Sequence, residues 1–359
     1  MPTCKGKAKK LNLALQGGGA HGAFTWGVLD RLLEEEDVEI HALSGTSAGA
    51  MNAAVLADGY TENGRQGAKD ELARFWGEIS GVSKLLEPWM QFTPHTMQQH
   101  FMGASGPIYT WFDTMSRLFS PYELNPMNLN PLRAVLERII DFKRLQHCDT
   151  MQVFVTATNV ETGQPRVFSG GELTVDALLA SGCLPFLYQA VEIDGVPYWD
   201  GGYLGNPALW PLHSRTECGD IMLVQINPIM RTGTPRSSVE IINRLNEITF
   251  NSSLISEMRA IHFVRRLIED GKLDTEHYRH VNMHMIAPPE DLHALSASSK
   301  LNPSWEFFTF LHAQGRAEME RWLKANKAML GVDSTLDIET TFLTKPKRAP
   351  KNAPKVADA

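Results

Sequence analysis

One serine of the chain stands in a pattern typical of a nucleophile. Residues 45–49 read Gly-Thr-Ser-Ala-Gly, so Ser47 lies between Gly45 and Gly49 in a G-x-S-x-G motif. In a nucleophile elbow of this pattern the serine occupies a strained turn from a strand into a helix, and the glycines give the backbone room. The helix N-terminus would stabilise negative charge near the hydroxyl. So short a motif leaves a second interpretation open, in which Ser47 only caps the helix.

A glycine-rich loop near the N-terminus could bind an anion. Gly17, Gly18 and Gly19 are followed by His21 and Gly22, and the backbone N–H groups of such a loop can converge on one negative charge. In an acyl hydrolase, Gly17 to Gly19 would form the oxyanion hole for a tetrahedral intermediate. In a dinucleotide-binding oxidoreductase, Gly17, Gly19 and Gly22 would fit GxGxxG and bind a pyrophosphate.

The two interpretations of the glycine loop differ in what they require of the next strand. A dinucleotide fold places an acidic residue at the end of that strand, about 20 residues on, to bind the ribose hydroxyls. Here the strand ends in the serine motif, and the acids Glu36, Asp37 and Glu39 precede or begin it. The sequence therefore favours the hydrolase, with a dinucleotide-binding oxidoreductase as the alternative.

A third motif supplies a carboxylate. Asp200 is followed by Gly201 and Gly202, and paired glycines let the chain turn sharply and fix the direction of the side chain. A carboxylate with the ordinary pKa of about 4 is a weak base at neutral pH. If Asp200 activates Ser47 directly, burial must adjust its pKa, or the proton must transfer in concert with attack. Alone, the sequence DGG is an ordinary turn.

The segments around these motifs predict a sheet covered by helices. A short buried strand at 11–16 leads through the glycine loop into an amphipathic helix at 23–36, and a strand at 38–45 leads through the serine turn into an alanine-rich helix. Two successive units of this kind indicate a parallel or mixed sheet with helices on its faces. The remaining pattern predicts strands at 151–158, 165–169, 221–228 and 281–288, and a strand pair at 190–199 that turns at Asp194-Gly195. It also predicts helices at 71–79, 132–145, 175–180, 239–269 and 305–329.

Composition and charge limit the possible domain organisation of the chain. Its 359 residues are 43% apolar and 21% charged, and the net charge is −7 although both ends are basic, so the acidic body disfavours nucleic-acid binding. We expect a basic flexible N-terminus at 1–10, a catalytic domain at 11–228, a helical extension with one added strand at 229–343 packed on the same domain, and a disordered basic tail at 344–359. An aromatic-rich stretch at 81–131, interrupted by prolines, predicts an insertion or cap. Its residues 86–119 either pack in the core, line an acyl-chain pocket or form a lid that meets a lipid surface.

Cysteine spacing and hydropathy predict the cellular setting. Cys4, Cys148, Cys183 and Cys218 lie far apart, so neither a zinc site nor a disulfide framework is indicated, and we expect no metal or cofactor. No stretch reaches the roughly 18 apolar residues of a membrane span, and the N-terminus lacks the apolar core of a signal peptide. We expect a cytoplasmic protein whose contact with a membrane, if it has one, is peripheral; the sequence does not indicate its oligomeric state.

Taken together, the three motifs resemble the patatin-like phospholipase family, bacterial-type lipid acyl hydrolases. The order is the same over residues 11–228: a glycine-rich loop after the first strand, a G-x-S-x-G elbow, and a distant DGG. The resemblance implies a three-layer α/β fold with a central mixed, mostly parallel sheet flanked by helices, and hydrolysis of fatty-acyl esters of phospholipids or other lipids. It also implies a catalytic Ser47–Asp200 dyad without histidine and an oxyanion hole from Gly17 to Gly19. A non-catalytic lipid-binding protein of the same fold is a further alternative.

One position departs from the family, which usually has Arg or Lys where this chain has His21. A histidine is only partly charged at pH 7, so an oxyanion loop that depended on this side chain would be weaker or pH sensitive. We expect His21 instead to pack or hydrogen-bond locally. A Ser-Asp-His triad is a second open point, because several histidines, each of which we interpret as structural, follow Asp200: His213, His262, His280 and His284.

Overall fold

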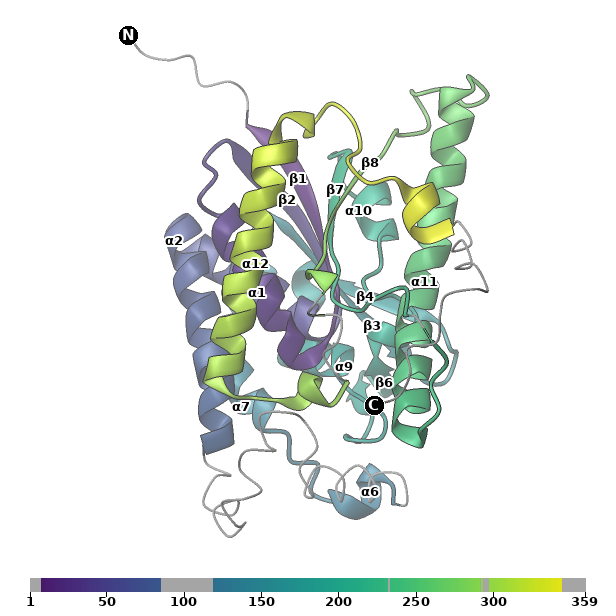
Figure 1. Ribbon diagram of the computed structural model, residues 1–359. Helices are drawn as coiled ribbons and strands as arrows, with labels where there is room; N and C mark the ends of the chain where they lie inside the picture. The colour runs from purple at the N-terminus through teal and green to yellow at the C-terminus, as the bar shows by residue number, and fades with distance from the viewer. Residues whose placement is uncertain (1–7, 85–118, 232, 291, 293–296, 344–359) are drawn as a thin grey trace, which may run out of the picture.

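An eight-stranded sheet forms the centre of the molecule in the computed structural model (Figure 1). The structure describes residues 8–84, 119–231, 233–290, 292 and 297–343. Most of the predicted N-terminal segment, the larger part of the predicted insertion and the predicted basic tail lie outside the described residues.

The sheet is mixed and mostly parallel, as the sequence predicts. Its strand order is β5-β6-β3-β2-β1-β7-β8, and β4 also pairs with β3. The parallel strands are β1 (Lys9–Leu15), β2 (Val38–Gly45), β3 (Gln152–Asn159), β7 (Asp220–Val224) and β8 (Asn282–Ile286). Antiparallel pairing adds β4 (Pro165–Ser169), β5 (Val191–Ile193) and β6 (Val196–Asp200) at one side.

Helices cover both faces of the sheet, which gives three layers (Figure 1). Alternate residues of β1 point to opposite faces: Leu11, Leu13 and Leu15 join one hydrophobic core, whereas Ala14 joins the other. The first core is covered by α1 (Gly22–Leu32), α2 (Ala48–Lys84), α7 (Pro131–Ile139), α9 (Val175–Ser181) and α12 (Trp305–Asn326). The second is covered by α10 (Trp210–Ser214) and α11 (Ser238–Glu269).

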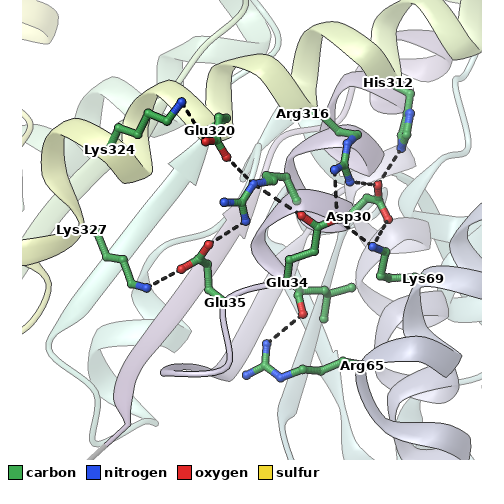
Figure 2. A network of polar contacts seen from close by, with 12 residues as sticks. Asp30, Glu34, Glu35, Arg65, Lys69, His312, Arg316, Glu320, Lys324 and Lys327 are labelled. Atoms are coloured by element: carbon green, nitrogen blue, oxygen red, sulfur yellow. Dashed lines mark hydrogen bonds and ion pairs between the residues drawn. The ribbon is translucent and has the colours of Figure 1, made fainter. Parts of the chain in front are cut away.

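The part of the chain after residue 228 packs directly on this sheet. β8 extends it beside β7, and α12 crosses α1 so closely that glycine is required at the contact. A Cβ atom on Gly27 would lie 2.0 Å from the carbonyl oxygen of His312, and one on Gly315 would lie 2.0 Å from that of Phe24. Ion pairs then join the two helices on their outer side (Figure 2).

Two predicted helices differ from the observed ones in how they are divided or extended, and α10 was not predicted at all. The predicted helix at 132–145 is two helices, α7 and α8 (Phe142–Gln146), because the side chain of Asp141 accepts hydrogen bonds from the amides of Lys143 and Arg144 and starts a new helix. The predicted helix at 71–79 is the second half of α2, which continues across a kink at Asn63 and Gly64. Of the helices that the structure describes, none is both long and apolar enough to cross a membrane.

Candidate active site

Ser47 occupies the turn between β2 and α2 in a left-handed backbone conformation, with φ 53°. This conformation is uncommon for a residue other than glycine and is often found where strain serves a function. The flanking glycines are required by close contacts: a Cβ atom on Gly45 would lie 2.5 Å from the Gly49 carbonyl oxygen, and one on Gly49 would lie 2.1 Å from that of Leu15. The G-x-S-x-G sequence thus forms a strained strand-to-helix turn.

Strand register brings Ser47 and Asp200 together. β4 lies along one edge of β3 over residues 154–158, so β2 and β6, which pair with β3 at 152–155 and 157–159, must share the other edge. β2 runs parallel to β3 and ends at Gly45 opposite Val155, while β6 runs antiparallel and ends at Asp200 opposite Ala157. The two strands therefore end facing each other, and the Ser47 side chain lies close enough to the Asp200 carboxylate to favour its ionised form.

Asp200 is buried, and its surroundings favour a base at neutral pH. Burial raises the pKa of its carboxyl from 3.8 to about 7, against the opposing effects of a hydrogen bond from the Gly202 amide (2.7 Å), the nearby Ser47 side chain and the charge of Lys300. The glycines after it are again required by contacts: a Cβ atom on Gly201 would lie 2.1 Å from the Thr156 carbonyl oxygen, and one on Gly202 would lie 2.9 Å from the carboxylate. A carboxylate in this setting can accept a proton from a hydroxyl far better than an exposed aspartate can.

The glycine loop lies against the serine turn. A Cβ atom on Gly17 would be 3.0 Å from the Ser47 Cβ, and the Gly17 amide donates to Asn206 Oδ1 at 2.7 Å. This amide is thus already occupied. In the part of the chain that the structure describes, the amides of Gly18 and Gly19 donate no hydrogen bond to protein, which leaves them as the N–H groups of the loop that an oxyanion could meet.

His21, which follows the loop, carries no charge at neutral pH. Burial, assisted by the charge of Lys300, lowers the pKa of its ring from 6.5 to about 3. The ring Nε2 lies 2.7 Å from Ser299 Oγ, and Phe307 contacts the ring edge-on. These contacts agree with local packing and hydrogen bonding. Gly22 allows α1 to approach α2, since a Cβ atom there would lie 2.8 Å from that of Ala48.

Two of the histidines that follow Asp200 have partners of their own. His284 is buried between Asp220, 3.0 Å from its Nε2, and Thr335, 2.9 Å from its Nδ1. His280 Nε2 lies 3.6 Å from Glu269. Within the described ranges no histidine hydrogen-bonds to Ser47 or Asp200, and no group of three metal-binding side chains occurs there. The described geometry thus contains a serine–aspartate pair rather than a triad.

Several groups at the site carry no sequence motif and were not predicted. Ser181 Oγ accepts a hydrogen bond from the Ser47 amide (2.9 Å) and donates to the Thr156 carbonyl (2.6 Å). Gly182 leaves space beside the nucleophile, since a Cβ atom there would lie 3.5 Å from Ser47 Oγ. Asn206 holds the glycine loop, and Lys300 approaches it from far along the chain. The one sequence signal near them is the break of the helix at Gly182.

Comparison with known proteins identifies a family for more than half of the chain. The family model described as patatin-like phospholipase matches residues 13–213, which include the glycine loop, Ser47 and Asp200. No curated protein sequence is significantly similar to the chain.

Solved structures of bacterial proteins are similar at low sequence identity. VipD from Legionella pneumophila is 15% identical with a TM-score of 0.43, and the similarity covers 94% of this chain and 73% of that one. The type III effector protein ExoU is 16% identical with a TM-score of 0.33, covering 89% of this chain and 53% of that chain. ExoU in its heterodimeric complex with SpcU, from the type III secretion system of Pseudomonas aeruginosa, is 16% identical with a TM-score of 0.33, covering 94% and 57%. The chain thus spans little more than half of the ExoU chains.

Proposed function

The chain belongs to the patatin-like phospholipase family and is a lipid acyl hydrolase, and from this we propose that it cleaves fatty-acyl esters of phospholipids or other lipids with Ser47 as nucleophile and Asp200 as general base. The observation that supports these roles most strongly is the placement of the Ser47 side chain beside a buried carboxylate whose pKa is raised to about 7. A left-handed turn at the nucleophile and two loop amides that donate to no described residue complete the set of groups that acyl transfer needs.

The first half of the reaction forms an acyl-enzyme. Asp200 takes the hydroxyl proton of Ser47 while Oγ attacks the ester carbonyl carbon, and the carbonyl oxygen becomes a negatively charged oxyanion. The amides of Gly18 and Gly19 hold this oxyanion, and Gly17 keeps the loop in place through its bond to Asn206. When the intermediate collapses, the ester bond breaks, and the leaving alcohol takes the proton from Asp200.

The second half releases the fatty acid. Asp200 accepts a proton from a water molecule that attacks the acyl carbonyl, and the same amides hold the second oxyanion. Collapse of this intermediate breaks the bond to Ser47 Oγ, which regains a proton from Asp200. The products are a free fatty acid and the alcohol portion of the lipid. No oxidant, metal or cofactor enters the balance of these steps.

Fatty-acid release from phospholipid vesicles tests this proposal. We expect Ser47→Ala to lower kcat by at least about 10³-fold, because the covalent intermediate cannot form. Ser256→Ala is the matched control, since Ser256 is exposed on α11 and its hydroxyl bonds only within that helix. Circular dichroism should show both variants folded. Equal release by Ser47→Ala and the wild type would overturn the assignment of the nucleophile.

We also propose that the protein is cytoplasmic and meets its substrate at a membrane surface. Exposed apolar side chains follow α6 (Pro121–Leu124) and occur in the turn before β5: Met127 (77% exposed), Leu129 (64%) and Phe186 (67%). The two segments contact each other, since Gln189 Nε2 donates to the Asn125 carbonyl (2.8 Å). The same turn begins near Asp200, whose amide donates to the Cys183 carbonyl at 2.8 Å. An apolar surface beside the catalytic carboxylate suits extraction of a lipid from a bilayer.

Introducing charged side chains at this surface tests the membrane contact separately from ester hydrolysis. We expect the double change Met127→Glu, Leu129→Glu to lower the initial rate on vesicles by about 10-fold, because apolar area that would enter the lipid interface is lost. The rate on a water-soluble short-chain ester should stay within about twofold of the wild type. Val332→Glu is the control, since Val332 is equally exposed elsewhere (69%). Unchanged rates on vesicles would remove this part of the proposal.

Residues 229–343 are proposed to complete the catalytic domain. They add β8 to the sheet and α12 to the face that carries α1, and they place Lys300 against the glycine loop. A protein that consists of residues 1–228 alone is therefore expected to be inactive and poorly folded. An active, folded product of 1–228 would contradict this.

A further inference from the structure

The short 3₁₀ helix at Ala297–Leu301 packs on the glycine loop. A Cβ atom on Gly19 would lie 2.4 Å from the Lys300 carbonyl oxygen, so the loop tolerates only glycine where the two backbones meet. Ser299 bonds to His21 at the other end of the same contact. The backbone of this distant segment is thus fitted to the oxyanion loop.

A chain of hydrogen bonds runs from the Lys300 ammonium into that loop. Lys300 Nζ donates to Asn227 Oδ1 at 2.5 Å, and Asn227 Nδ2 donates to the carbonyl oxygen of Gly17 at 2.8 Å. The Gly17 carbonyl and the Gly18 N–H belong to one peptide group. A peptide whose oxygen accepts a hydrogen bond becomes a stronger donor at its nitrogen, and a positive charge at the start of the chain increases the effect.

Among the residues that the structure describes, no direct ion pair cancels the charge of Lys300. Glu247, the nearest carboxylate on α11, is held by Arg231 (2.7 Å) and Arg244 (3.1 Å), and among the described residues no carboxylate lies within ion-pair distance of Lys300. Burial lowers the pKa of Lys300 to about 8; Glu247 and Asp200 raise it and Arg231 lowers it. At neutral pH this ammonium is therefore mostly charged, whereas His21 beside it is neutral.

We infer that Lys300 is a positioning residue for acyl transfer: its ammonium polarises the Gly17–Gly18 peptide through Asn227 and so strengthens the Gly18 amide as an oxyanion donor. This inference rests on the proposed function. Lys300 also lies within electrostatic range of Asp200 and favours the ionised carboxylate that acts as base. Lys300, from the C-terminal part of the chain, would thus support both the oxyanion donor Gly18 and the base Asp200.

Kinetics of Lys300→Met beside Lys300→Arg test this role. We expect Lys300→Met to lower kcat about 10- to 100-fold with little change in KM, because the oxyanion forms only in the transition state. Lys300→Arg should retain most of the activity. The wild-type pH profile should decline above about pH 8, where Lys300 loses its proton, and this decline should vanish in Lys300→Met and move to higher pH in Lys300→Arg. Lys324→Met, which removes an exposed lysine of α12, is the control.

Thermal unfolding separates this role from a structural one. A desolvated lysine contributes little stability, so Lys300→Met should unfold at the same temperature as the wild type or higher. The inference is overturned if kcat and the alkaline limb are unchanged in Lys300→Met, or if the loss of activity merely follows a loss of folded protein. Its failure is distinct from failure of the proposed function: an inactive Ser47→Ala with a fully active Lys300→Met removes only the inference.

Discussion

The helix face built by α1, α2 and α12 and the proposed catalytic edge of the sheet, where Asp200 and Lys300 lie, both carry charged side chains, but they surround them differently. On the helix face the charges are paired several times over (Figure 2). Asp30 of α1 meets Arg316 and His312 of α12 and Lys69 of α2. Although burial raises the pKa of Asp30, its close contacts with His312 and Arg316 lower it to about 2.

At the catalytic edge the same residue type behaves in the opposite way. Asp200 has no ion-pair partner among the described residues, and burial raises its pKa to about 7. The lysines differ similarly: hydrogen bonds to Asp37 and Glu35 outweigh burial and raise the pKa of Lys327, whereas burial lowers that of Lys300 to about 8. Paired charges join helices and stay ionised, while charges left unpaired can change protonation near neutral pH and take part in proton transfer.

Neutralising the unpaired carboxylate should have the largest effect. Asp200→Asn is expected to lower kcat by at least about 10³-fold, because no base accepts the Ser47 proton. The same change should raise the unfolding temperature at pH 8. The folded-state pKa is raised, so ionised Asp200 destabilises the fold at pH above its ordinary pKa of 3.8, and fully so above about 7. Kinetics and thermal unfolding at pH 8 check both; an active or less stable variant would contradict the account.

The pH dependence of the wild type tests the same contrast between Asp200 and Asp30. Below about pH 7 Asp200 becomes protonated and cannot act as base, so kcat/KM should fall about tenfold per pH unit, reaching roughly 100-fold at pH 5. The fold itself should persist over this range, because Asp30 keeps its charge down to about pH 2 and its ion pairs with it. Hydrolysis of a soluble ester from pH 5 to 8, with circular dichroism at each pH, tests this. A flat profile down to pH 5 would mean that Asp200 is not the base.

Substitutions at two glycines with the same backbone conformation distinguish an effect on the glycine loop from an effect on the rest of the fold. Gly19 (φ 57°) abuts the Lys300 backbone, whereas Gly163 (φ 62°) has no atom within 4 Å of its would-be Cβ. Replacing either with alanine costs about 1 kcal/mol of strain. Only Gly19→Ala should also displace the oxyanion loop and lower kcat about 10-fold. Equal kcat values for the two variants would argue against a defined loop geometry in catalysis.

The smallest effect is expected in the paired network. Arg316→Met removes the partner of Asp30 and Glu34 on α12 and should lower the free energy of unfolding by about 1 kcal/mol, less at high salt, with kcat unchanged. Denaturant unfolding at two salt concentrations, beside ester hydrolysis, measures it. A loss of kcat in this folded variant would show that the network reaches the catalytic edge, contrary to the comparison.

The sequence predicted the parts of the site that carry local motifs. Ser47 and Asp200 each stand beside glycines at a strand end, and the order of these motifs also led to the fold class, which the structure confirms. The helix break at Asp141 was missed because a single capping aspartate within an amphipathic pattern gives little signal.

The rest of the site depends on tertiary packing. Asn206 accepts a hydrogen bond from the Gly17 amide, which the sequence had grouped with the two proposed oxyanion donors. Lys300 reaches the loop from a serine-rich segment without a motif. The sequence drew attention to the neutral His21 instead. Long-range hydrogen bonds of this kind follow from how helices and loops meet, and no local pattern of residues encodes them.

The central claim, that Asp200 activates Ser47, is tested most directly by covalent labelling with a lipid-like fluorophosphonate. The rate of adduct formation should be followed at pH 8 by intact mass, and the modified peptide mapped. The account predicts a single adduct on Ser47 in the wild type and labelling at least about 100-fold slower in Asp200→Asn. An adduct on another residue, or equal rates in the two proteins, would contradict it.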